Sequence, residues 1–193
     1  MNFELTEEQF SIKEMAHRFA IEKMLPNAAM WDKESIFPKE TLRLAAKLGF
    51  AGIYCSAKHG GSALGRLEAT LIFEQLSMAC PSTAAFISIH NMASWMIDRF
   101  GNDDIRRRFL PKLTNMDYFA SYALTEPGSG SDAASLSSTA KRDGDYYIIN
   151  GEKAFISGGG VSDVFVCMLR TGGNQADGIS CVVVEKDTPA LSF

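Results

Sequence analysis

The spacing of apolar residues along the chain changes once, near residue 118. Up to that point apolar residues recur every three or four positions, which is the spacing of one face of an α-helix. Thr6 and Gln9 have the sequence pattern of a capping box, in which each side chain bonds the backbone N–H of the other residue. The apolar residues that follow at 12–19 are therefore expected on the buried face of a first helix.

Four more helices are expected before residue 118, and they span 38–49, 67–79, 82–100 and 103–110. Pro38 is suited to a first helical position, and Gly49 can take the left-handed conformation of a C-terminal cap. Asn102 is expected to cap the last helix and Pro111 to end it. The glycine-containing stretch 51–65 is expected to be a loop.

After residue 118 the pattern changes to short runs rich in Val, Ile, Phe and Tyr, separated by Asp-Gly, Asn-Gly and other glycine-containing breaks. Such runs are typical of strands joined by tight turns, and Asn150 with Gly151 has the sequence of a hairpin turn. The expected strands span 119–124, 145–150, 152–157, 163–170 and 178–185. The pattern predicts an α+β protein, with an all-α helical domain at 1–118 and a small antiparallel β-domain at 119–193.

The composition is that of a soluble globular protein, because 46% of the 193 residues are hydrophobic and 22% are charged. The net charge of -4 argues against nucleic acid as a partner, since phosphate binding needs an excess of Lys and Arg. Residues 106–108 and Lys112 form a basic cluster, which is expected to be a solvated helix face or a docking patch for an acidic ligand. Neither a secretion signal nor a long apolar run occurs, so no membrane span is expected.

The four cysteines, Cys55, Cys80, Cys167 and Cys181, are far apart in the sequence. They form no C-x-x-C pair, and no histidine stands at the spacing of a metal ligand. The sequence therefore predicts neither a zinc site nor a disulfide framework, and the chain is expected to bind no metal. Free thiols of this kind fit a reducing compartment.

Some residues of catalytic type have structural interpretations. His90 lies on the expected helix at 82–100, where it is expected to be a hydrogen-bonded core histidine or a residue of a substrate pocket. The acidic pairs at 7–8 and 103–104 fall in first helical turns, where negative charge compensates the helix dipole. His59 is expected in a loop.

The segment TEPGSGSD at 125–132 contains two glycines and two serines, a composition that brings backbone close to a ligand. Residues 128–133 match a loose G-x-G-x-x-A dinucleotide pattern, but that pattern has meaning only between a strand and a helix of a parallel sheet. Helices precede this segment and expected hairpins follow it, so a nicotinamide-binding fold is not predicted. A Walker loop is excluded because no Gly-Lys-Ser/Thr follows.

Three longer segments carry a family resemblance. ALTEPGSGSDAAS at 123–135 resembles the signature of the acyl-CoA dehydrogenases, NGEKAFISGGG at 150–160 resembles their second flavin-contacting strand, and FGNDDIRRRFLPKL at 100–113 resembles the helical segment before their β-domain. The resemblance runs in order over nearly the whole chain. It implies an FAD enzyme that removes the α-proton of an acyl-CoA thioester while a hydride leaves the β-carbon for the flavin.

The resemblance also implies the residues that contact the flavin. Thr125 is expected to bond its pyrimidine end through the hydroxyl, Ser157 to bond N5, and Ser131 to bond the CoA part of the substrate. The family often has Trp and Thr where this chain has Phe155 and Ser157, and both replacements keep the aromatic face and the hydroxyl. The full set of expected flavin contacts is Tyr122, Ala123, Leu124, Thr125, Glu126, Pro127, Gly128, Ser129, Gly130, Ser131, Phe155, Ile156 and Ser157.

Within the family, three segments look most like those of members that act on isobutyryl-CoA in valine breakdown: SDAASL, KAFISGGGVSDVFVCMLRTGG and EKDTPALSF. Butyryl-like and 2-methylbutyryl-like substrates stay open as alternatives. The family's base is a Glu on a C-terminal helical domain, which is not expected within these 193 residues. We therefore predict no catalytic residue here, with Glu126 the nearest candidate, and a partial enzyme that is inactive alone.

The same resemblance implies that an electron-transferring flavoprotein accepts the electrons and that the full-length enzyme is a homotetramer. It also implies a compartment, which is the cytoplasm in bacteria or the mitochondrial matrix in eukaryotes. The alternative function is a non-catalytic module that binds flavin or acyl-CoA, or an interaction protein.

Overall fold

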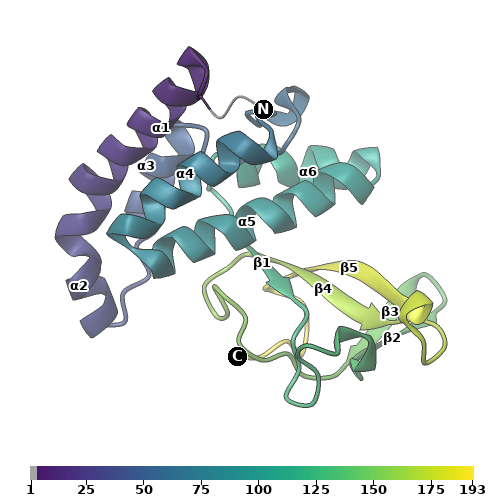
Figure 1. Cartoon of the computed structure of the whole chain (residues 1–193). Helices are drawn as coiled ribbons and strands as arrows, with labels where there is room; N and C mark the ends of the chain where they lie inside the picture. Colours follow the sequence, from purple (N-terminus) through teal and green to yellow (C-terminus); the bar gives the residue numbers. More distant parts are fainter. Residues whose placement is uncertain (1–3) are drawn as a thin grey trace. The chain divides into compact units, whose positions relative to one another are not determined.

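A computed structural model describes residues 4–193, and the chain divides into two compact units at the junction of Tyr118 and Phe119 (Figure 1). The first unit is helical and the second contains one sheet, so the predicted α+β class is confirmed. No helix follows β5 (Ile179–Glu185) within the described residues. Their helices are also too short or too polar to cross a membrane. The prediction that the chain starts without a secretion signal rests partly on residues 1–3, outside the described range.

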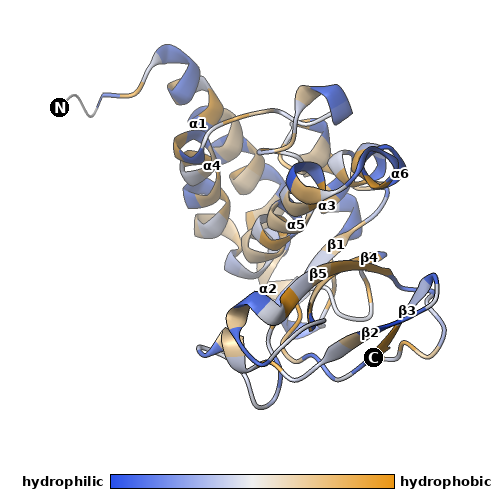
Figure 2. Ribbon diagram, turned by 90° about the vertical axis from the view of Figure 1, so that its right-hand side faces the viewer, coloured by the Kyte–Doolittle hydropathy of each residue, from blue (hydrophilic) through white to orange (hydrophobic). Residues whose placement is uncertain are grey.

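The helical unit contains six α-helices, a π-helical turn and a 3₁₀ turn in its described part: α1 (Glu7–Phe19), η1 (Ala20–Met24), α2 (Leu25–Lys33), α3 (Lys39–Lys47), η2 (Ala57–His59), α4 (Arg66–Ala79), α5 (Pro81–Phe100) and α6 (Asp103–Thr114). Helix α4 packs against α1 and α5, and α5 packs against α6. Figure 2 shows apolar and polar residues alternating around these helices. The predicted capping box of Thr6 and Gln9 is present at the start of α1.

The segment from Ala20 to Lys33 is helical although the apolar spacing did not predict it. Its π-helical turn shifts the positions of the side chains relative to α1, and so interrupts the 3.6-residue period. Pro26 then stands in the first turn of α2, where a missing N–H is tolerated. Ala20, Met24 and Trp31 are buried in this segment, too few and too widely spaced to form a recognisable apolar stripe.

The buried face of α5 differs from the predicted apolar stripe. Phe86, Ala93 and Ile97 are buried as expected, but Phe100 is 70% exposed. Polar residues occupy much of the face instead. Asn91 accepts a bond from Ile53 N at 2.7 Å and donates one to the Phe50 carbonyl at 2.7 Å, which fixes the 50–53 loop to the helix.

His90 is a hydrogen-bonded core histidine, which was one of the two interpretations that the sequence left open. The ring is fully buried, and its Nε2 lies 3.0 Å from the Leu113 carbonyl of α6. Burial lowers the pKa of His90 to about 4, against the opposing effect of that carbonyl. The ring is therefore neutral near pH 7 and links α5 to α6.

Helix α6 continues through Pro111 to Thr114, so the prediction that the proline ends it is wrong. The proline removes one backbone donor, but Leu110 and Leu113 on the inward face are fully buried, and this burial outweighs the loss. The basic cluster on α6 is largely compensated. Arg106 and Arg107 pair with acidic residues of the first turn, which fits a solvated helix face.

The sheet unit contains five strands: β1 (Ala120–Ala123), β2 (Thr139–Asp143), β3 (Tyr146–Asn150), β4 (Val164–Arg170) and β5. β5 pairs antiparallel along one edge of β4, while β1 and then β2 pair parallel with β4. The sheet is therefore mixed and not purely antiparallel as predicted. Parallel pairing became possible because about forty residues separate β1 from β4, enough for a crossover.

Two details of the predicted strand pattern are wrong. The run 152–157 is irregular, because Ala154 N bonds the Thr125 carbonyl and Phe155 has a φ of 56°, outside the range of a strand. The hairpin lies at Gly144, with a φ of 60°, between β2 and β3, and not at 150–151. Strand β2, with the sequence TAKRD, has only Ala140 buried, so it lacked the apolar pattern that predicts a strand.

Candidate functional site

The segment 124–138 leaves the carboxyl end of β1 and forms a compact loop. Glu126 and Ser129 exchange two backbone hydrogen bonds of 2.9 and 3.1 Å, with Pro127 and Gly128 between them. The Ser129 hydroxyl, which is buried, donates to the Asp132 carbonyl at 2.8 Å. Pro suits the second position of such a turn, so the TEPGSGSD sequence itself specifies the loop.

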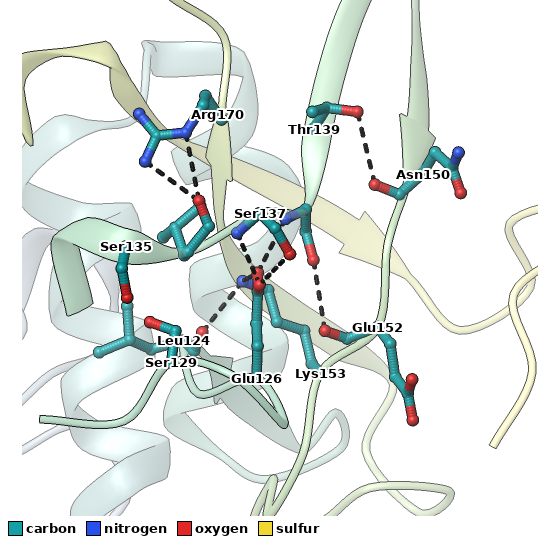
Figure 3. A network of polar contacts seen from close by, with 12 residues as sticks. Leu124, Glu126, Ser129, Ser135, Ser137, Thr139, Asn150, Glu152, Lys153 and Arg170 are labelled. Carbon is teal, nitrogen blue, oxygen red and sulfur yellow. Dashed lines mark hydrogen bonds and ion pairs between the residues drawn. The ribbon is translucent and has the colours of Figure 1, made fainter. Parts of the chain in front are cut away.

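The Glu126 carboxylate is buried and accepts four hydrogen bonds (Figure 3). Ser137 donates its backbone N–H at 2.6 Å and its hydroxyl at 2.8 Å, Ser138 donates its N–H at 3.0 Å, and Lys153 Nζ lies 2.7 Å away. Burial alone would raise the pKa of Glu126, but Lys153 and the serine donors hold it well below its usual range. Because every lone pair is engaged and the group stays ionised, Glu126 is unsuited to accept a substrate proton.

A second segment, 151–157, lies against this loop. Ala154 N donates to the Thr125 carbonyl at 2.8 Å, and Lys153 Nζ donates to the Leu124 carbonyl at 3.0 Å. The carbonyl of Ser157 is held from the other side, since Ser121 Oγ of β1 lies 2.5 Å from it. Residues 29 positions apart in the sequence are thereby brought together, in agreement with the resemblance, which implied that the two segments act together.

Several groups on these two segments have no role in the packing of the described chain. The hydroxyls of Thr125, Ser131 and Ser157 make no hydrogen bond within the residues that the structure describes. Phe155 is 94% exposed at an unfavourable positive φ. Three unbonded hydroxyls and an exposed aromatic ring, gathered on neighbouring segments, are available to a ligand.

The glycines of the loop support the same conclusion. A Cβ at Gly128 or Gly130 would meet nothing within 4 Å, and neither residue has a positive φ. The fold of this chain therefore does not require glycine at either position. An open approach to the backbone from outside the chain is the property that these glycines provide.

The other predicted site residues have structural surroundings. Ala123 and Ile156 line a cavity of about 520 Å³ on an apolar face of the sheet, together with Phe165, Cys167 and Leu169. Tyr122 is half-buried on β1; burial, and secondarily Cys181, raise its pKa. The four cysteines are free thiols, and no cluster of metal-ligating side chains occurs between residues 4 and 193.

Sequence reasoning missed the residues that hold the loop. Lys153, Ser137 and Ser138 enclose Glu126, and Arg170 at the end of β4 donates to the carbonyls of Ala134 and Leu136 at 2.7 and 3.0 Å. The available signal was a lysine directly before the run AFIS at 154–157 and an arginine at the end of a buried strand. Long cations at such places are expected to find a buried acceptor.

Comparison with known proteins identified related sequences over the whole chain. Residues 6–117 match the family model "Acyl-CoA dehydrogenase, N-terminal domain", and residues 121–193 match "Acyl-CoA dehydrogenase, middle domain". The chain is 56% identical over 98% of its length to mitochondrial isobutyryl-CoA dehydrogenase of Bos taurus, and 57% identical over 98% to that of Dictyostelium discoideum. It spans 45% and 46% of these two relatives, about half their length.

A solved structure agrees with the fold. The acyl-CoA dehydrogenase of Bacillus anthracis, determined in complex with FAD, is 31% identical and superposes with a TM-score of 0.88. The superposition covers 98% of this chain and 32% of that one. The likeness therefore extends over both the helical and the sheet unit.

Proposed function

The chain belongs to the acyl-CoA dehydrogenase family, and on this basis we propose that it forms the helical and sheet parts of an FAD enzyme that dehydrogenates a short, branched acyl-CoA. The observation that carries the proposal is the group of unbonded hydroxyls, open glycines and exposed Phe155 on two segments that lie against each other. These segments are the ones that the family motifs assign to the flavin.

The residues present fit FAD. Thr125 and Ser157 offer hydroxyls to the polar edge of the isoalloxazine, and Phe155 offers an aromatic face. Gly128 and Gly130 leave their backbone open to approach. When bound, FAD supplies the hydride acceptor for the β-carbon of the substrate. The role of this chain is to bind and orient the cofactor with hydrogen-bond donors whose positions are fixed before the cofactor binds.

Ser131 is proposed to bond the CoA portion of the substrate. Its side chain is exposed at the end of the glycine-containing turn, and no residue of the described chain bonds its hydroxyl. A hydroxyl in this position holds the substrate without touching the carbons that react. Its contribution is therefore to affinity and orientation.

Isobutyryl-CoA is the proposed substrate because the two relatives reported above are named for it and share more than half of their aligned residues with this chain. Butyryl-CoA and 2-methylbutyryl-CoA are the alternatives that the experiment below distinguishes. One methylene in an apolar pocket changes binding by only about 1 to 3 kcal/mol, so the preference must be measured as a ratio of rates.

The base that removes the α-proton is proposed to lie outside these 193 residues, on a further helical domain of a longer enzyme. The near candidate, Glu126, is enclosed by four donors and unsuited to the role. The proposed assembly is a homotetramer, and the proposed electron acceptor is an electron-transferring flavoprotein. The compartment is the mitochondrial matrix for a eukaryotic chain and the cytoplasm for a bacterial one.

An anaerobic titration tests the function. The 193-residue chain and a longer protein that continues it with the helical domain are each mixed with FAD and with isobutyryl-, butyryl- or 2-methylbutyryl-CoA. We expect flavin binding to both, and bleaching of the flavin with formation of enoyl-CoA only in the longer protein, fastest with isobutyryl-CoA.

Three outcomes would change the proposal. Bleaching by the short chain alone would show that it contains a base, and Glu126→Gln would be the next variant to test. Flavin binding to the longer protein without enoyl-CoA formation would favour a non-catalytic flavin-binding module. If the longer protein stays colourless with added FAD, the remaining hypothesis would be that it is an interaction protein.

A further inference from the structure

Lys153 connects the two segments of the candidate site. It lies two residues before Phe155, and its ammonium donates to the Leu124 carbonyl and to Glu126 Oε1 at 3.0 and 2.7 Å (Figure 3). Its side chain is 13% exposed and that of Glu126 is 5% exposed. A pair this enclosed is screened little by solvent, unlike the exposed ion pairs elsewhere in the chain.

Glu126 extends the connection to a third segment. Oε2 accepts from the backbone N–H and the hydroxyl of Ser137, and Oε1, which Lys153 also engages, accepts from the N–H of Ser138 at the far end of the loop. One carboxylate therefore joins the start of the loop, its end and the 151–157 segment. If the ammonium were removed, a buried charge and the Leu124 carbonyl would lose a partner together.

Two further hydrogen bonds join the two segments: Ala154 N donates to the Thr125 carbonyl, and Ser138 Oγ donates to the Glu152 carbonyl at 3.3 Å. Thr125 directly precedes Glu126, and Ser157 follows Lys153 by four residues. Two of the four hydrogen bonds that set the positions of the two unbonded hydroxyls relative to each other are thus made by the Lys153 ammonium.

We propose that Lys153 is a positioning residue for the flavin: through Leu124 and Glu126 it sets the spacing between the Thr125 and Ser157 hydroxyls. This proposal rests on the function proposed above. The Lys153 ammonium is engaged by the Leu124 carbonyl and the Glu126 carboxylate, so in this proposal it acts on the cofactor through these neighbours and takes no part in the chemical step.

The experiment uses the longer, FAD-binding protein with Lys153→Met, Lys153→Arg and the double variant Glu126→Gln/Lys153→Met. Lys186→Met is the matched control, because Lys186 makes a 2.6 Å ion pair in the same unit with Asp163, a residue that belongs to neither segment. The measurements are the Kd for FAD, the visible absorption spectrum of bound flavin, and amide hydrogen exchange of residues 124–138 without flavin.

We expect Lys153→Met to weaken FAD binding about tenfold or more, to shift the flavin spectrum and to speed exchange at Ser137 and Ser138. Lys153→Arg should restore part of the affinity. Lys186→Met should keep the wild-type Kd and spectrum. The double variant leaves no unpaired buried charge, so it keeps the test valid if Lys153→Met does not fold.

Wild-type affinity and spectrum in a folded Lys153→Met or in the double variant would overturn the proposal. An equal effect of Lys186→Met would also overturn it, because the loss would then reflect general destabilisation. Failure of the wild-type protein to bind FAD would count against the proposed function, whereas unchanged exchange at 124–138 in Lys153→Met would count against the positioning role alone.

Discussion

Replacing Ser157 by alanine is expected to slow flavin reduction without weakening the fold. The hydroxyl is exposed and makes no hydrogen bond within the described residues, so its removal leaves no buried group unpaired. If the hydroxyl bonds the flavin, the substitution removes one hydrogen bond worth about 0.5 to 1.5 kcal/mol. At 1.36 kcal/mol per factor of ten, the reduction rate falls roughly two- to thirteenfold.

The assay is stopped-flow bleaching of the bound flavin under anaerobic conditions with saturating isobutyryl-CoA. Ser121→Ala is the matched control, because the Ser121 hydroxyl is buried and lies 2.5 Å from the Ser157 carbonyl and 2.8 Å from Ser162 Oγ. That variant should lower the free energy of unfolding by about 1 to 3 kcal/mol, whereas Ser157→Ala should leave it unchanged.

A wild-type reduction rate in Ser157→Ala would refute the assignment of this hydroxyl to the flavin. A lower thermal stability of Ser157→Ala would refute the structural part of the reasoning, since it would mean that the hydroxyl has a partner within the fold. The reduction rate thus tests the contact of the Ser157 hydroxyl with the flavin, and the thermal stability tests whether that hydroxyl supports the fold.

Three further predictions follow from buried and exposed polar groups. Ser131→Ala should raise the Kd for acyl-CoA and leave the saturated reduction rate largely unchanged, as binding titrations and single-turnover kinetics can show. The free energy of unfolding of the helical unit should fall by about 1.5 kcal/mol between pH 6.5 and 5, because His90 stays neutral in the fold, where its pKa is about 4, while the His90 ring of the unfolded chain binds a proton below pH 6.5. Denaturant unfolding at several pH values should show this dependence, and the His90→Leu variant should lose it. Asn91→Ala should destabilise the same unit by about 2 to 4 kcal/mol in denaturant unfolding, since Ile53 N and the Phe50 carbonyl lose their partner.

The sequence was sufficient for the features that depend on local chemistry. The capping box at Thr6, the loop at 51–65 and the class of each unit follow from residue spacing and turn composition. The two flavin motifs were found by resemblance, and their adjacency in the fold agrees with it. Local patterns therefore predicted most helices and strands, and the longer family motifs located the candidate site.

The features that escaped prediction depend on distant partners. The pairing of β1 with β4 is decided by the sheet as a whole, and neither strand's pattern specifies its neighbour. The Lys153 ammonium finds its partners at Leu124 and Glu126, 29 and 27 positions earlier, and Asn91 finds its partners in a loop about 40 positions earlier. An apolar-spacing argument assigns such polar residues to the surface, so it places them wrongly.

The parallel pairing of β1 with β4 has a consequence for the order of folding. Ala120 pairs with Val164, so the loop that follows β1 cannot be held in place until the chain has been made through β4 and its ends have met. The helical unit needs no residue beyond Tyr118 for its own contacts and is expected to fold first. During refolding, pulse-labelled hydrogen exchange should find amides of α4 and α5 protected before those at 120–126, and simultaneous protection would contradict this order. On the ribosome, the loop that is proposed to bind flavin would then be among the last parts of these 193 residues to become ordered.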